Sequence, residues 1–538
     1  MPQRSGLESF TLKNHSLAPH TVGTQSSSMQ SAGILPSNTQ SSDGPVLCAR
    51  THGFAPFAIR ILCGLFLAIV TLGLSSCHAS SYYYYKFPQY TFANRPVPPS
   101  QFANRVMVSV TANGTQGSLQ ILDASRDIRG NIQNTITSFS ISGYSSGYPS
   151  KIKSFPEQTK GYIYSDSDGS VGIVDYGKEA SSGSAGSFPS KSSSVAVPAT
   201  FTRVYSAEPA IGQVIVYDNL LGSAYALNLP NVQKVVVNPG DTVALAMVRN
   251  SNTLYRIVKL NANQANPPGA VDCQPYYLPV YCVVPVASDP KNPSFDRPVD
   301  AYFSIDGNNV FVLNCGPECG GVRSSVSTLQ LAPLNIFTVP TTNPDVNPLV
   351  VNVAVPGGAT AAISDGNNLY VSGQQLLPDG LFTGNLTTIS LASNAVTGKV
   401  SISDGYHSKM LFADDNTLWI GSQFCATGER AKLGQNYNCL TRYDLGALTA
   451  QVIPNVTPGS STAAQQVPYP NTDGNLYYYG SLTGLCWVQN LHKVYTAYGG
   501  QVHAFNTNDG SEINNFYITV QGTALDVAYI DAETNAAN

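Results

Sequence analysis

The sequence predicts an all-β protein built as a single β-propeller, a ring of four-stranded sheets called blades. The first observation is a short template, in which a turn residue precedes an apolar residue, an aromatic residue and another apolar or small residue. The second is its recurrence, eight times at intervals of 39 to 76 residues, which is typical of a repeat architecture. The third is the turn chemistry between the predicted strands, which is rich in Asp-Gly and Pro-Gly pairs. Strand content throughout favours a propeller over a helical solenoid.

The template is clearest in DGNNVFV, from Asp306, and DGNNLYV, from Asp365. Other copies carry PGDT, DDNT or NLHK at the turn, so these Asp and Asn residues make a turn rather than a ligand site. A second run with period-two alternation follows most copies and often ends in an acidic residue, as strands of a packed sheet require. The eight copies of the template begin at Arg105, Gly161, Arg203, Thr242, Asn309, Asn368, Thr417 and Lys493.

The two ends of the repeat region predict how the ring closes. TALDVAYID, residues 523–531, reads as a first strand with no second strand after it, while the unit at Arg105 has no obvious first strand. Pairing the C-terminal strand with the N-terminal blade would complete that blade and remove exposed sheet edges. Counting second strands predicts eight blades. Seven is the alternative, in which the short unit at Arg203 merges with a neighbour. The propeller spans residues 105–531, and 532–538 form a C-terminal tail.

The order of turn, apolar-Tyr-Val, about ten residues and then Val-x-apolar-apolar-Asp resembles the YVTN-type β-propeller repeats of bacterial surface proteins. This resemblance covers roughly Arg105 to Asp531. It implies the fold and leaves the function open.

The N-terminal residues predict export. Residues 1–59 are polar without apolar periodicity, which predicts a disordered extension. Arg60 and the 14-residue apolar core at 61–74 follow, and this core is short for a membrane span, which needs about 20 residues. The core ends in Leu-Ser-Ser-Cys at Cys77, which resembles the bacterial lipobox.

The lipobox resemblance implies a lipoprotein signal peptide at 60–76, a lipid on Cys77, and a tether at 77–104. The mature chain would then be anchored to a membrane of the bacterial cell envelope. His78 stands where an inner-membrane retention signal has Asp, so the outer membrane is the expected location. An uncleaved anchor and an ordinary secretory signal peptide are the alternatives.

Composition excludes one class of partner. Only 11% of the 538 residues are charged, against about 25% in an average soluble domain, and the net charge is −4. Phosphate backbones need clustered Lys and Arg, and no such cluster appears, so nucleic acid is not an expected partner.

Seven cysteines follow Cys77, and export permits disulfides. Proximity in the sequence predicts three pairs and leaves Cys486 free. The CGPEC stretch has three residues between its cysteines and no thioredoxin-like context, so a structural disulfide is preferred over a redox or zinc site. The predicted pairs are Cys273–Cys282, Cys315–Cys319 and Cys425–Cys439.

Two places are candidates for ligand or partner contact. Asp404 and His407 lie where a first strand is predicted to begin near the central channel. The loop between Cys425 and Cys439 concentrates charge in a chain that has little, and loops of this kind commonly carry function. Its charged residues are Glu429, Arg430 and Lys432.

No nucleophile elbow, phosphate-binding loop, zinc-protease motif or dinucleotide fingerprint occurs. The sequence therefore favours a non-enzymatic envelope lipoprotein that binds a protein or glycan ligand, and it predicts no catalytic residue, metal ligand or cofactor. Calcium is the one metal left open, because DSDG at Asp166 has a fragment of calcium-loop spacing, although a hairpin turn is preferred there. A lactonase-like or other propeller hydrolase with a metal in the channel, and a structural surface-layer or adhesion component, are the alternatives.

Overall fold

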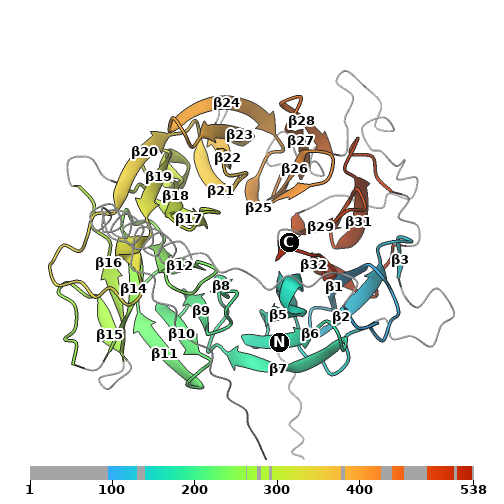
Figure 1. Cartoon of the computed structure of the whole chain (residues 1–538), viewed down its shortest axis with the longest axis horizontal. Coiled ribbons are helices and arrows are strands. Elements are labelled where there is room, and N and C mark those ends of the chain that lie inside the picture. The colour runs from blue at the N-terminus through green and yellow to red at the C-terminus, as the bar shows by residue number, and fades with distance from the viewer. Residues whose placement is uncertain are drawn as a thin grey trace, which may run out of the picture. The chain divides into compact units, whose positions relative to one another are not determined.

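The computed structural model describes residues 95–129, 140–261, 263–274, 280–289, 294–376, 382–425, 439–453, 481–513 and 518–535. All of them belong to the second of two compact units, Ala68–Asn538. Within the described residues the strands form eight antiparallel sheets, and Figure 1 shows these blades arranged around a ring. The eight-bladed prediction is confirmed, and the unit at Arg203 is a blade of its own.

Each blade uses its strands in the same order, from the centre of the ring outwards. The first strands are β32 (Thr523–Tyr529), β4 (Pro149–Phe155), β8 (Ser194–Ala196), β12 (Val232–Val237), β17 (Pro298–Phe303), β21 (Gly358–Ser364), β25 (Tyr406–Ala413) and β29 (Leu482–Val488). The second strands are β1 (Arg105–Ala112), β5 (Lys160–Ser165), β9 (Arg203–Glu208), β13 (Ala244–Val248), β18 (Asn309–Asn314), β22 (Asn368–Leu376), β26 (Thr417–Gln423) and β30 (Lys493–Tyr498). The predicted template falls on or beside the second strand of every blade.

Six of the blades have four strands, as predicted, whereas blade 4 (from β12) has five and blade 8 (from β29) has three within the described residues. The third strands are β2 (Gln116–Asp123), β6 (Ser170–Asp175), β10 (Gln213–Asp218), β14 (Leu254–Leu260), β19 (Ser325–Gln330), β23 (Phe382–Ser390), β27 (Leu440–Asp444) and β31 (Gln501–Asn506). The outer strands are β3 (Ile128–Arg129), β7 (Ala180–Ser187), β11 (Ser223–Asn228), β16 (Val280–Pro285) with β15 (Asp272–Gln274) beyond it, β20 (Leu349–Ala354), β24 (Ala395–Ile402) and β28 (Thr449–Ile453). We number the blades 1 to 8 from the one that contains β1. The top face of the ring is the side where first strands begin, and the bottom face is the side where they end.

The turns explain why Asp recurs at the start of the repeat. In the blade 5 and blade 6 hairpins, an Asp side chain accepts hydrogen bonds from the backbone of the following residues: Asp306 from Asn308 at 3.1 Å, and Asp365 from Asn368 at 2.7 Å. Partial burial acts to raise the pKa of both carboxyls, but these hydrogen bonds lower it below its usual value. The acidic residues are therefore turn-forming groups, as the sequence predicts.

The core lies between neighbouring blades rather than inside each one. Strand β1 sends Val106, Val108 and Val110 into a cluster shared with blade 8, and it sends Met107 into another cluster shared with blade 2. Successive side chains of a strand point to opposite faces, so one strand can serve both interfaces. Every blade is thereby held by its two neighbours, and the ring has to close to bury its first and last faces.

The ring closes in the predicted way. Strand β32 pairs antiparallel with β1, with Val108 opposite Val527. Beside this pairing Arg105, with a 5% exposed side chain, binds two buried carboxylates: Asp531 at 2.6 Å and Glu179 of blade 2 at 2.8 Å. The backbone N–H of Ser100, in the segment before β1, donates to Glu179 at 2.8 Å. One cation thus joins the last strand, the first blade and the second blade.

Candidate ligand site in the central channel

The first strands line a central channel that opens at the top face. A cavity of about 760 Å³ occupies it, a volume in the range that small-molecule sites use. Its walls come from the first strands of several blades, including β4, β12, β25 and β32, and from loops at the top face. A second cavity of about 410 Å³ adjoins it toward the bottom face, where first strands end, and both cavities share Lys153 and Lys234.

Positive charge gathers in this channel. Four lysines line the larger cavity: Lys151 and Lys153 from β4, Lys234 from β12, and Lys409 from β25. Lys151 and Lys153 alternate with Ile152, so both side chains stand on the channel side of the strand. With Arg249, which lines the same cavity, five cations surround one opening in a chain with 11% charged residues, and Asp166 and Asp526 are the carboxylates of that lining.

Two of the four lysines are paired with carboxylates of other blades. Lys234 lies 2.6 Å from Asp300, and Lys409 lies 3.1 Å from Asp526. Asp526 also accepts the backbone N–H of Ile152 at 2.9 Å, so it ties blade 1 to blades 2 and 7. Desolvation acts to lower the pKa of Lys234, but Asp300 and the nearby Tyr406 raise it above the ordinary lysine value.

The other two lysines have no carboxylate partner within the described parts of the chain. Lys151 donates to the backbone oxygen of Ser193 at 3.2 Å and lies 5.6 Å from the ring centre of Tyr164, while Lys153 lies 5.7 Å from that of Phe155. Water reaches both side chains, yet the surrounding protein displaces much of their hydration shell. This desolvation lowers the pKa of both ammonium groups, and the charge of Lys409 lowers it further, while the nearby carboxylate of Asp166 acts to raise the pKa of Lys151.

Aromatic and hydroxyl groups complete the wall. Tyr148, Tyr162, Tyr164 and Tyr406 line the larger cavity, together with several serines. Tyrosine rings offer flat apolar surfaces, and their hydroxyls, like those of serine, can donate or accept hydrogen bonds. The channel therefore combines free cations with groups that can hold the body of an organic ligand.

The structure places Asp404 and His407 beside the channel wall rather than in its opening. His407 is fully buried, and its Nε2 lies 2.7 Å from the backbone oxygen of Ser403. Burial lowers the pKa of His407 to about 4, so the imidazole is neutral at physiological pH. Asp404 accepts the backbone N–H of Gly384 at 3.1 Å. These contacts hold the start of β25 against blade 6, and a role in ligand contact stays a prediction.

The remaining predicted contacts lie elsewhere. Glu429, Arg430, Lys432 and the lipidation residue Cys77 fall outside the described residues. The loop that carries the three charges leaves β26 at the top face. In the described part of the chain no helix has the length and apolar character needed to cross a membrane, and the predicted signal peptide lies outside that part.

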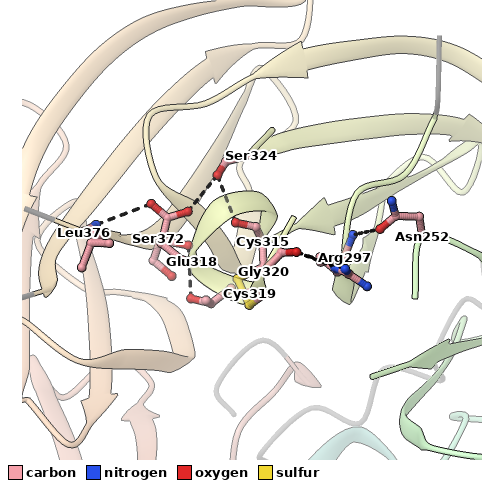
Figure 2. The surroundings of a disulfide bond; sticks show 10 residues. Asn252, Arg297, Cys315, Glu318, Cys319, Gly320, Ser324, Ser372 and Leu376 are labelled. Atoms are coloured by element: carbon pink, nitrogen blue, oxygen red, sulfur yellow. Dashed lines mark hydrogen bonds between the residues drawn. A yellow bond between two sulfur atoms is a disulfide. The ribbon is translucent and has the colours of Figure 1, made fainter. Parts of the chain in front are cut away.

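All three predicted disulfides form, and Cys486 is free and buried. Figure 2 shows the Cys315–Cys319 bond in the 3₁₀ turn η4 (Gly316–Cys319), where Ser324 donates to Glu318 at 3.1 Å and Arg297 donates to the Gly320 oxygen at 3.0 Å. Cys319 itself lines the larger cavity. The disulfide therefore holds a loop at the rim of the channel.

Metal ligands do not gather in the described residues: no group of three or more His, Cys, Asp or Glu is placed to hold an ion. The DSDG stretch is the turn between β5 and β6, in which Asp168 accepts the Ser170 N–H at 3.0 Å, so the preferred hairpin interpretation is confirmed.

Sequence reasoning missed the channel lysines. The alternation in SKIKS, residues 150–154, was available, but its meaning depends on knowing that β4 is the wall of the channel. Two alternate lysines on a predicted first strand are the signal that would have identified these channel residues.

Comparison with known proteins finds similarity among solved structures alone. No protein-family model matches the sequence, and no curated protein matches it. Among solved structures it is similar to Kuenenia stuttgartiensis hydrazine synthase, at 16% identity over 70% of this chain and 99% of that one, with a TM-score of 0.41. It is also similar to the dihydro-heme d1 dehydrogenase NirN in complex with DHE, at 13% identity over 84% and 83% of the two chains, with a TM-score of 0.47.

A third similar structure is the β-propeller domain of Cps50 (Swd1) from Myceliophteria thermophila, at 11% identity over 65% of this chain and 94% of that one, with a TM-score of 0.41. The likeness is one of fold. At these identities it says nothing of what the channel binds.

Proposed function

We propose that this chain is a lipid-anchored protein of the bacterial cell envelope whose propeller binds an anionic ligand in its central channel without transforming it. The observation that carries the proposal is the pair of lysines, Lys151 and Lys153, that face the channel with no carboxylate partner in the described structure. Lys234 and Lys409 add two more cations, each offset by one Asp. The channel wall therefore carries a surplus of positive charge.

Physical chemistry favours an anion in such a place. A cleft lined by one sign of charge, with protein rather than water around it, focuses the field and concentrates counter-ions. Desolvation lowers the pKa of Lys151 and Lys153, and repulsion from the charge of Lys409 lowers it further. A bound anion would relieve that repulsion and would be held by charge-assisted hydrogen bonds. An acidic glycan or an acidic segment of a protein has the required charge.

Removing both free lysines is expected to weaken anion binding. Calorimetric titration of the full-length chain in detergent micelles would compare polygalacturonate and polyphosphate with uncharged dextran. We expect the polyanions to bind and the Lys151→Ala/Lys153→Ala double variant to bind them at least tenfold more weakly, because each hydrogen bond to a charged group contributes about 1.5–3 kcal/mol.

Lys178→Ala is the matched control, since Lys178 lies in the same blade with a 78% exposed side chain outside the channel. It is expected to bind like the unmodified protein. Equal weakening by the control, or equal binding of dextran, would contradict the proposed site.

The anchor is tested separately. Replacing Cys77 with serine removes the sulfur that a lipid would occupy, and the protein is expected to leave the membrane fraction for the soluble fraction on cell lysis. A lipidated Cys anchors stably because each buried CH₂ contributes about 0.8 kcal/mol. Cys63→Ser, in the apolar core of the same segment, is the control and should remain with membranes. A Cys77→Ser protein that stays membrane-bound would refute the lipid anchor.

A further inference from the structure

Resting on the proposed function, we infer that the ligand presents a linear dianion to the channel, one charge at Lys151 and one at Lys153. The two lysines are alternate residues on β4, and alternate residues of a strand lie about 6.6 Å apart on the same face. The strand runs from the top face toward the bottom face, so the two ammonium groups stand at different depths. The site can therefore select a ligand by the distance between its charges as well as by their sign.

The residues that line the two cavities show that Lys151 lies nearer the top face than Lys153. Lys151 lines only the upper cavity of about 760 Å³, whereas Lys153 lines both this cavity and the lower one of about 410 Å³. Lys151 is held near the mouth by the Ser193 oxygen and the Tyr164 ring. Lys153 lies over Phe155, two residues further along the strand. A ligand that enters from the top face meets Lys151 first and Lys153 second.

Two lysines of β4, with Arg249 beside the upper cavity, remain without a carboxylate partner among the described residues. Asp300 and Asp526 already offset Lys234 and Lys409, so a ligand gains little net attraction from that pair. A monoanion would leave one free lysine of β4 unpaired. A dianion of matching length pairs both.

The surface beside the two lysines suits an uncharged body between two charges. Tyr162 and Tyr164 of β5 line the upper cavity, as do Val195 and Val197 from the blade 3 side. These groups fit methylene carbons or the face of a sugar ring better than a further charge. The lower cavity ends at Asn535, whose side-chain amide nitrogen and oxygen have no hydrogen-bond partner within the described residues. That amide can bind a polar group at the deep end of the ligand.

The test is a series of α,ω-dicarboxylates from malonate to suberate, with hexanoate as the monoanion, titrated into the full-length protein in detergent micelles. Affinity is expected to peak at adipate and pimelate, whose extended charge separation is close to the spacing of about 6.6 Å between the backbone positions of the two lysines. These are expected to bind at least tenfold more tightly than malonate or hexanoate. A parallel series of alkylene bisphosphonates separates the two chemical sources of charge, because a peak confined to that series assigns the ligand to the phosphates.

The single variants supply the decisive comparison. Lys151→Ala and Lys153→Ala are each expected to abolish the length dependence, so that adipate binds no better than hexanoate, while Lys178→Ala keeps the peak. Polyanion binding that is lost in the double variant, with no length preference in either series, would overturn the dianion and leave the proposed function standing. Polyanion binding that survives in the double variant would overturn both.

Discussion

Replacing Arg105 with alanine is expected to lower the free energy of unfolding by about 3–5 kcal/mol, the cost of removing one partner from a buried ion cluster. Arg105 is the only cation within 3 Å of both Asp531 and Glu179 among the described residues, and all three side chains are at least 95% buried. The substitution leaves two buried carboxylates, with Arg95, 3.8 Å from Asp531, as the remaining cation. Asp531 follows the end of β32 and Glu179 belongs to blade 2, so the lost stability comes from the contacts that close the ring.

Denaturant unfolding followed by tyrosine fluorescence would measure the loss. Arg126→Ala is the matched control, because Arg126 is 63% exposed and lies 3.7 Å from Asp123 in the same blade. Because the charge of Arg126 lies in solvent, its pairing with the buried Asp123 is expected to contribute about 0–1 kcal/mol. If both variants lose the same small amount of stability, the cluster does not hold the ring.

Much of the ring could be predicted because its signal is local. The second strand of each blade lies between two others with both faces buried, so it carries an apolar and aromatic run such as Val310-Phe311-Val312. The turn before it needs residues that bind their own backbone or adopt positive φ, which Asp306 and Gly307 provide. Strand β8 has three residues and β3 has two, and such short strands leave no pattern to read.

The candidate site was harder to predict because it depends on how strands from different blades are placed relative to one another. Lys151 and Lys153 become a pair only when β4 is known to be a wall of the channel. Asp404 and His407 were predicted because histidine is scarce in this chain and a first strand was expected to begin there, but both side chains have backbone partners in the fold. Tyr406 and Ser408 line the channel, and His407 between them points the other way, as alternation along a strand requires. The residue types pointed to Asp404 and His407, whereas the alternation of side chains along β25 places Tyr406 and Ser408 in the channel wall.

The same neighbourhood gives the second large expected effect. Gly384→Ala is expected to destabilise the protein by about 3 kcal/mol, near the upper end of what overpacking costs. A Cβ at Gly384 would lie within 2 Å of the Ser403 backbone oxygen and 3.0 Å from Cε1 of His407. No rotamer change can relieve a clash with a carbonyl oxygen. That oxygen is also the hydrogen-bond partner of His407, so the start of β25 must shift.

Gly398→Ala is the matched control, since Gly398 lies on β24, the strand paired with β23 in the same blade, and a Cβ there would be 3.7 Å from Thr388. Its stability should change by less than about 1 kcal/mol, because an alanine in a compatible conformation costs nothing in packing and restricts the unfolded chain. Thermal unfolding of the two variants side by side distinguishes a tight blade contact from a general intolerance of side chains. If Gly384→Ala is as stable as Gly398→Ala, then Asp404 and His407 do not hold β25 against blade 6, and both residues return to the candidates for ligand contact.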